Sequence, residues 1–175
     1  MPTIVHGFDW PERLVVGTVG RPGERAFYLQ ARDGRRVTSV ALEKEQSAVL
    51  AEKVSELLDE VATVDDNRFS VPASAPTELR DAAPLDQPVE PEFRAGALSL
   101  GFDPATAQVV IEAYPIDEEL EIVTETDEDG EEVDAVVEIP EPAEVFQVKI
   151  PVGSARAFVE RTREVVAAGR RPGDA

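Results

Sequence analysis

The chain contains no cysteine and a single histidine, His6. Without cysteine there are no disulfides, thiolate nucleophiles or cysteine-ligated metals. With one histidine, a catalytic triad or a histidine metal cluster has at most one imidazole available, so we expect no stoichiometric zinc. We interpret His6 as an ordinary residue of an N-terminal strand, and we predict no catalytic residue, no metal site and no cofactor.

Long apolar runs are also missing. Nowhere do about 18 apolar residues follow one another, and the N-terminus, MPTIVHGFDWPERL, has no basic region followed by an apolar run. We therefore expect a cytoplasmic protein with no membrane partner. A length of 175 residues with 42% hydrophobic residues suffices for one substantial core and is short for two, which predicts a single domain over residues 1–175.

Basic residues are scarce: 17 Lys and Arg face 36 Asp and Glu, and the net charge is −19. The segment from Asp117 to Glu144 holds 14 acidic residues and no Lys or Arg, which leaves a net charge of −5 for the rest of the chain. This acidity predicts repulsion from nucleic acids. We interpret residues 117–144 as an acidic insertion, either a β-ribbon around Asp129-Gly130 or a mobile loop.

The strongest pattern in the sequence is an order of three strands and a helix that occurs twice. In residues 13–62, two strands, RLVVGTVG and RAFYLQAR, are followed by a turn at Asp33-Gly34 and a third strand, Arg36 to Leu42. Apolar residues at helical spacing then predict an amphipathic helix. Residues 93–169 repeat this order, and at an offset of 108 Val40 aligns with Val148 and Leu42 with Ile150. In this second unit, Ser154 is expected to cap the helix and Gly169 to end it.

The connector between the units, residues 64–92, is rich in proline and has little periodicity, which indicates an extended segment. One three-stranded sheet with one helix buries its apolar face poorly. We therefore predict an α+β fold in which two pseudo-repeated βββα units share an antiparallel β core with two helices packed on it. Two separate domains joined by the connector are the alternative.

The stretches FDWPERLVVGTVGRPGERAFYLQARDG, VALEKEQ, FRAGALSLGFD and VVIEA resemble an uncharacterised actinobacterial family, domain of unknown function 3090. The resemblance brings no activity, substrate or catalytic residue. Members of that family typically continue past VAAGR into a tail rich in Cys and His that resembles a zinc ribbon. The sequence ends at RRPGDA without such a tail, which either was removed or never existed, so we expect the zinc role implied by the family to have no ligands among these residues.

Five arginines fall within sixteen residues of the first unit. They predict a basic hairpin that binds an acidic partner or phosphate, although solubilising surface charge is the simpler interpretation. The binding residues expected are Arg21, Arg25, Arg32, Arg35 and Arg36.

We expect an uncharacterised, non-catalytic interaction or regulatory protein with an unknown protein partner and no nucleic-acid partner, and a homodimer is left open. The alternative is a metal-assisted hydrolase or phosphoryl-transfer enzyme that uses carboxylates and arginine. The residues to examine for that alternative are Asp9, Glu12, Glu112 and Arg25.

Overall fold

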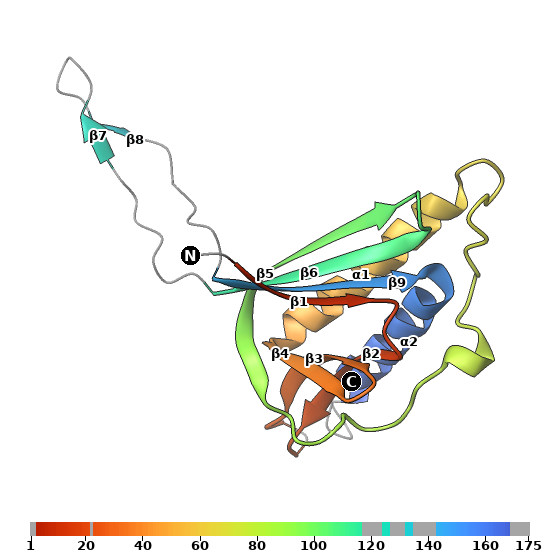
Figure 1. Ribbon diagram of the computed structural model, residues 1–175, viewed down its shortest axis with the longest axis horizontal. Coiled ribbons are helices and arrows are strands. Elements are labelled where there is room, and N and C mark those ends of the chain that lie inside the picture. The colour runs from red at the N-terminus through yellow and green to blue at the C-terminus, as the bar shows by residue number, and fades with distance from the viewer. Residues whose placement is uncertain (1–2, 22, 117–123, 127–131, 135–142, 169–175) are drawn as a thin grey trace.

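The computed structural model describes residues 3–21, 23–116, 124–126, 132–134 and 143–168. These residues form an α+β fold in which two helices pack on a mixed seven-stranded sheet (Figure 1). The elements are β1 (Ile4–Asp9), β2 (Arg13–Val19), β3 (Ala26–Asp33), β4 (Arg36–Leu42), α1 (Lys44–Ala62), the 3₁₀ turn η1 (Thr77–Leu79), β5 (Pro91–Asp103), β6 (Gln108–Pro115), β7 (Thr124–Thr126), β8 (Glu132–Asp134), β9 (Glu144–Pro151) and α2 (Val152–Ala168).

The strand order in the sheet is β1-β9-β6-β5-β4-β3-β2. Strands β2, β3 and β4 are antiparallel neighbours, as are β5, β6 and β9, so the strands expected from the sequence are confirmed. The expected antiparallel core is wrong, because β4 pairs with β5 and β1 with β9 in parallel. The connectivity allows the β4/β5 pair: a parallel pair needs a long crossover, and α1 with the connector supplies it.

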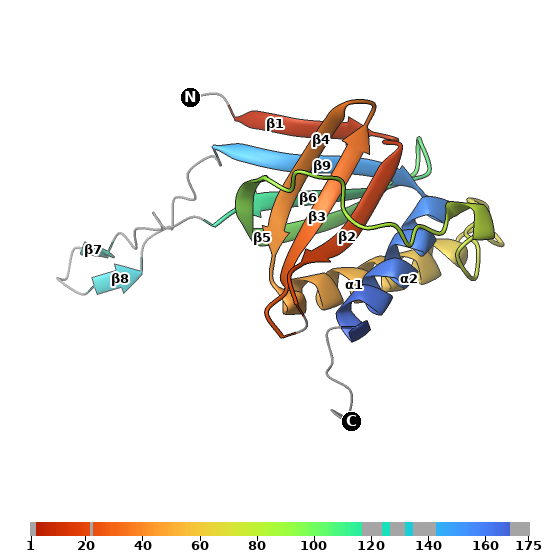
Figure 2. The same cartoon turned by 90° about the horizontal axis from the view of Figure 1, so that it is seen from below.

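The sheet is strongly curved, so that β2, β3 and β4 run steeply across β1, β9 and β6 (Figure 2). The chain passes from the edge strand β1 to the opposite edge strand β2 through a short turn, in which Trp10 has a φ of 54°. Each edge strand has a carbonyl that accepts from an arginine: Gly7 from Arg36, and Val16 from Arg161. These side chains occupy backbone groups that an unpaired sheet edge would otherwise expose.

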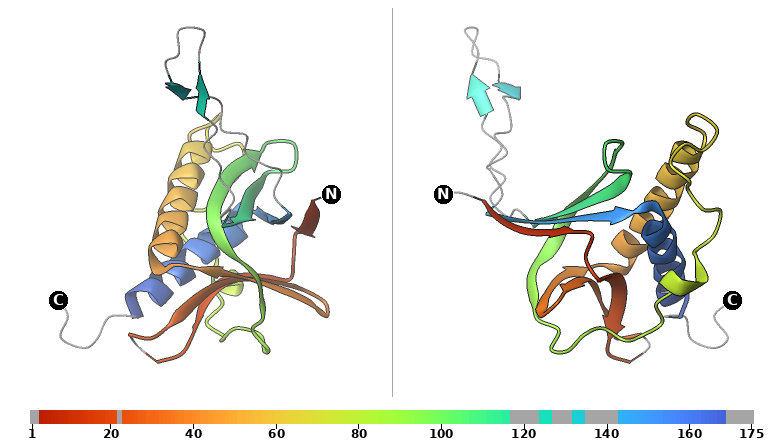
Figure 3. Two further views of the ribbon diagram at one scale, coloured as in Figure 1. Left: turned by 90° about the vertical axis from the view of Figure 1, so that its left-hand side faces the viewer. Right: turned by 45° about the vertical axis from the view of Figure 1, so that its right-hand side comes forward.

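Both helices lie on the same side of the sheet and contact each other (Figure 3). The helical spacing predicted from the sequence is confirmed, since α1 buries Leu50, Val54, Leu58 and Val61. One hydrophobic cluster joins these residues to buried side chains from both halves of the chain, including Phe146. Within the described part of the chain, neither helix has the length and apolar composition that crossing a bilayer requires.

The second helix begins earlier than expected. Helix α2 starts at Val152, directly after the last residue of β9, so Ser154 lies inside the helix and is not its cap. Pro151 fits this sharp transition, because its fixed φ is compatible with the first turn of a helix. The expected end at Gly169 lies outside the described residues.

The proline-rich connector packs against the body of the protein. It buries Val71, Ala75 and Leu85, and Asn67 bonds the backbone of Val71 through both its amide nitrogen and its oxygen. Gly17 of β2 lies so close to Leu85 that a Cβ at that position would be 2.5 Å from the leucine side chain. The connector is therefore a docked segment, which the lack of periodicity did not reveal.

The acidic insertion joins two neighbouring strands, since β6 ends at Pro115 and β9 begins at Glu144. Within it, β7 and β8 pair antiparallel, with Thr124 opposite Asp134, and they lie away from the seven-stranded sheet (Figure 1). The pairing of these six residues agrees with the ribbon alternative where the insertion is described. Residues 117–123, 127–131 and 135–142, including the expected turn at Asp129-Gly130, lie outside the described residues.

Candidate functional site

The five arginines of the expected basic hairpin lie at two ends of β3. Arg21 and Arg25 are in the loop that precedes β3, whereas Arg32 is near its end and Arg35 and Arg36 follow it. An eight-residue strand is roughly 25 Å long, so the two groups do not form one surface. Exposed Arg21 and Arg35 have no ion pair with another described residue.

Two of the arginines have structural partners. Arg32 donates to Asp86 at 2.9 Å and lies 3.9 Å from a carboxylate oxygen of Glu12, which fixes the connector to β3. Arg36 donates to the carbonyl of Gly7, and its guanidinium carbon lies 3.9 Å from the ring centroid of Phe8, a cation–π geometry. These contacts leave Arg25 as the hairpin arginine with the strongest claim to a ligand.

Arg25 lines a pocket of about 500 Å³ at the N-terminus of α1. The side chain is half-buried, and its Nε is buried without a hydrogen-bond partner among the described residues. Lys44 contributes a second cation that has no described partner, and Arg94 contributes a third that pairs with Glu43. Glu24 and Glu45 complete the charged lining, and the apolar part comes from β3 and β4. The pocket thus combines cations, carboxylates and apolar groups.

A second charged region holds the connector in place. Arg13 is only 8% exposed and donates to both oxygens of Asp81, to Asp86 at 3.0 Å and to the carbonyl of Ala83. Arg161, also 8% exposed, donates to the carbonyls of Val16 and Asp81. Sequence reasoning missed this network, because its partners are 68 to 145 residues apart and no pattern joins them.

Electrostatics in this network favour the charged forms of the aspartates. Burial alone would raise the pKa of Asp81, but hydrogen bonds from Arg13 and from the N–H of Ala83 outweigh it and hold this pKa below its usual value. The pKa of Asp86 is likewise lowered, because hydrogen bonds from Arg13 and Arg32 overcome its partial desolvation. Burial lowers the pKa of Arg161, against the attraction of Asp81. We interpret the network as structural.

The residues of the enzymatic alternative are not brought together. Arg25 lines the pocket at α1, Glu12 lines a small cavity beside α2, and Glu112 lies on the open face of β6. Asp9 accepts from Gln108 at 2.9 Å. Tyr114 donates to Glu112 at 2.6 Å, and this bond, more than desolvation, raises the tyrosine pKa.

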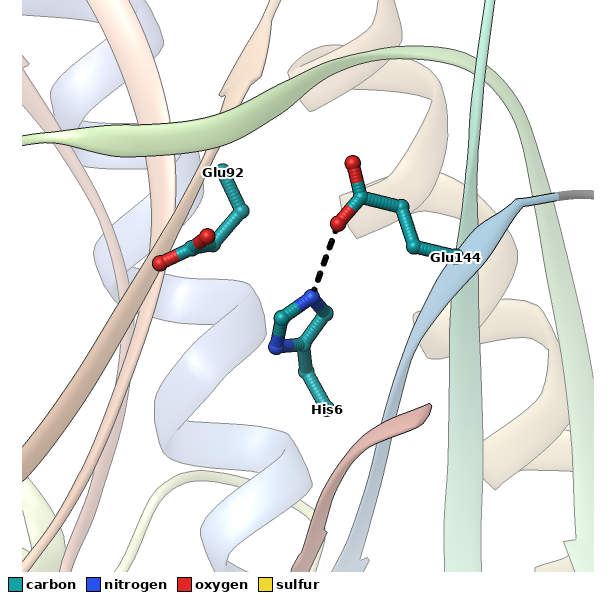
Figure 4. Close-up of side chains that lie close together, drawn as sticks. All are labelled: His6, Glu92 and Glu144. Atoms are coloured by element: carbon teal, nitrogen blue, oxygen red, sulfur yellow. Dashed lines mark hydrogen bonds and ion pairs between the residues drawn. The ribbon is translucent and has the colours of Figure 1, made fainter. Parts of the chain in front are cut away.

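His6 has acidic neighbours that the sequence did not indicate. Its Nε2 lies 2.9 Å from Oε2 of Glu144, the first residue of β9, and Glu92 of β5 lies nearby without contacting the imidazole (Figure 4). One potential ligand atom from each of the three side chains lies within 4.8 Å of the other two. His6 and Glu144 are half-buried and Glu92 is exposed. Of the described His, Asp and Glu residues, these three form the group that could hold a metal ion.

Comparison with known proteins identifies the family but not a function. Residues 6–174 match the family described as Protein of unknown function (DUF3090), and the chain belongs to that family. No curated protein and no solved structure matches the chain significantly.

Proposed function

We propose that this protein is a non-catalytic interaction protein that binds an acidic segment of a protein partner in the Arg25 pocket. The observation that carries the proposal is the buried, unpaired Nε of Arg25 in a pocket that also holds unpaired Lys44. A buried donor without an acceptor is costly, and a carboxylate or phosphate arriving from outside would satisfy it. We place this activity in the cytoplasm, as the sequence predicts.

The mixed lining favours a peptide over a bare polyanion. Glu24, Glu43 and Glu45 lie in the same pocket and would repel a ligand that carries many negative charges. A peptide presents one or two acidic groups to Arg25 and Lys44 while its apolar atoms cover Phe27 and Leu42, which also line the pocket. Such a ligand matches the pocket in charge and in hydrophobicity.

The rival enzyme has less support. A metal-assisted hydrolase built on Asp9, Glu12, Glu112 and Arg25 needs at least three of these side chains around one substrate. Arg25, Glu12 and Glu112 each line a different pocket of the described residues. The separation favours binding over catalysis by this set of residues.

The experiment measures binding of a fluorescently labelled decapeptide of alternating Glu and Ala by the full chain. Charge-assisted hydrogen bonds contribute about 1.5–3 kcal/mol, so R25Q is expected to lower the affinity roughly 10- to 100-fold. R35Q is the matched control, because Arg35 is exposed and has no described partner, and it should change the affinity less than about twofold. Equal losses in the two variants, or no saturable binding by the wild type, would contradict the proposal.

We also propose that the scaffold of this pocket arose from two copies of one βββα unit. In the sheet, β2-β3-β4 and β5-β6-β9 each alternate in direction, and each group is followed by a helix. Positions paired by the offset of 108 have similar burial: Val40 and Val148 are both 0% exposed, and Leu50 and its counterpart Phe158 are 4% and 2% exposed. A solved structure in which the two units fail to superpose would refute the duplication.

A further inference from the structure

We propose that His6, Glu92 and Glu144 bind a first-row divalent transition-metal ion, such as Zn²⁺ or Mn²⁺, at the edge of the sheet. The proposal is independent of the function proposed for the Arg25 pocket. The expectation of no stoichiometric zinc rested on the lack of thiolates and of a second imidazole, and it did not combine His6 with carboxylates from other strands. The fold brings two such carboxylates near the imidazole, and one of them, Glu144, contacts it (Figure 4).

The register of two strands brings His6 and Glu144 together. Strands β1 and β9 pair in parallel, with Ile4 beside Glu144 and His6 beside Phe146. Residues two apart on a strand face the same side of the sheet, and so do residues directly opposite each other on neighbouring strands. The side chains of His6 and Glu144 therefore lie on the same face of the sheet, two residues apart along the strands. Packing keeps the end of this face in place, because the ring centroids of Phe8 and Phe146 are 5.9 Å apart in the core.

The third ligand comes from β5, the neighbour of β4 and β6. Glu92 is the second residue of this strand and stands where β5 pairs with β4, next to Pro91, which lies opposite Ser39. Its carboxylate has no hydrogen bond or ion pair with another described residue. The carboxylate oxygens of Glu92 are therefore available to bind an ion. In an ordinary surface ion pair, a Lys or Arg side chain would occupy them.

The spacing suits one small ion. Two ligand atoms bound to the same ion at about 2.1 Å are at most about 4.2 Å apart. In a tetrahedral site they are about 3.4 Å apart. The three ligand atoms already lie within 4.8 Å of one another, so exposed Glu92 has to move by no more than about 1.5 Å. In the bound state, the ion replaces the contact of His6 Nε2 with Glu144 and neutralises two carboxylates that would otherwise repel each other.

The donor set decides the class of metal. An imidazole nitrogen favours Zn²⁺ and other first-row transition ions, whereas Mg²⁺ and Ca²⁺ prefer oxygen ligands alone. Three protein ligands leave at least one coordination position open, as in zinc sites that hold a water or an exchangeable ligand. The ion would also join β1, β9 and β5 at a point where β1 is an edge strand.

Because His6 is the sole histidine, its imidazole gives one set of side-chain NMR signals, which report on this place alone. The full chain is titrated with ZnCl₂, and the affinity is measured by calorimetry on the same samples. We expect the His6 signals to shift and to saturate at one equivalent of Zn²⁺, while an equal concentration of Ca²⁺ leaves them in place. Cations collected loosely by the acidic insertion would not move the His6 signals in this way.

Substitutions test each ligand. E92Q and E144Q should each weaken the Zn²⁺ affinity that the His6 signals report by at least tenfold. E125Q, which removes the same charge within the acidic insertion, should change it less than twofold. Thermal unfolding without metal shows that each variant is folded. His6 signals that do not respond to Zn²⁺, or equal losses in E92Q and E125Q, would overturn the proposal.

Discussion

Replacing Arg13 by methionine tests whether the connector is part of the folded core. The side chain is 8% exposed and makes four hydrogen bonds, with distances from 2.6 to 3.1 Å, to Asp81, Asp86 and Ala83. Methionine keeps most of the length and apolar surface of the side chain but supplies no donor. The substitution therefore leaves two partly buried aspartates without their main cationic partner.

The size of the effect follows from this geometry. Removing one member of a buried ion pair costs about 3–5 kcal/mol, because the remaining charge loses its compensation. Asp81 and Asp86 are 30% and 25% exposed, and they keep Arg161 and Arg32, respectively, so water and these two arginines offset part of the loss. We expect R13M to lower the free energy of unfolding by about 2–4 kcal/mol, a large share of the 5–15 kcal/mol typical of a folded protein.

Equilibrium unfolding in urea, followed by circular dichroism at neutral pH, measures this change. The matched control is R80M, because Arg80 is 58% exposed and lies 3.6 Å from Glu160 in a surface ion pair. Such a pair contributes between about 0 and 1 kcal/mol. A loss below about 1 kcal/mol for R13M, or equal losses for R13M and R80M, would refute the view that the network anchors the connector.

Three further predictions concern the connector and the acidic insertion. G17A places a Cβ 2.5 Å from the side chain of Leu85 and should cost about 1–3 kcal/mol, and a double-mutant cycle with L85A, measured in urea, should recover much of that loss. D81N should destabilise the protein by about 1–3 kcal/mol at pH 7. Because the folded-state pKa of Asp81 is lowered, its contribution is present above the pKa of the unfolded chain and is lost as the pH falls through the folded value. The difference in melting temperature between the wild type and D81N should therefore begin to shrink below about pH 4 and continue to shrink as the pH falls through the lowered pKa, and a constant difference would contradict this assignment. Replacing residues 118–142 by a short turn should preserve cooperative unfolding, because β6 and β9 are adjacent antiparallel strands, and should hold or slightly raise stability at low salt by relieving repulsion. If the insertion shields Arg21, Arg25 and Arg32, the same deletion should create salt-sensitive binding of a polyanion, and unchanged binding would reject the shielding alone.

Local patterns predicted most of the secondary structure. The runs rich in β-branched and aromatic residues at 13–20 and 25–32, and the turn before residues 36–42, identified β2, β3 and β4, because each strand pairs with a neighbour that is close in sequence. The spacing of Leu50, Val54 and Leu58 identified the buried stripe of α1. Gly34, with a φ of 62°, lies in the turn that Asp33-Gly34 predicted. These features depend on contacts between residues that are at most about twenty positions apart, such as Arg13 and Arg32, which short sequence patterns record.

Features that depend on distant contacts could not be predicted in this way. The parallel pairing of β4 with β5 is set by the path of α1 and the connector, and neither strand encodes its neighbour. The same limit applies to the candidate metal site, whose ligands His6, Glu92 and Glu144 lie on three strands. The sequence placed the five arginines in the hairpin region around β3. It could not show which of them would find a carboxylate or a carbonyl partner.

The arginines that do find partners explain how an irregular connector can be held without secondary structure of its own. A segment outside a helix or a sheet leaves backbone carbonyls that still need donors when they are buried. Arg13, Arg156 and Arg161 donate to the carbonyls of Ala83, Pro72 and Asp81, in that order. Each of the three is 8% exposed, and a guanidinium can donate to a carbonyl and a carboxylate at once, as Arg156 does with Pro72 and Asp59. Arg25 differs from these three arginines, because its Nε is buried without a hydrogen-bond partner among the described residues, and this difference is the reason for proposing a ligand there.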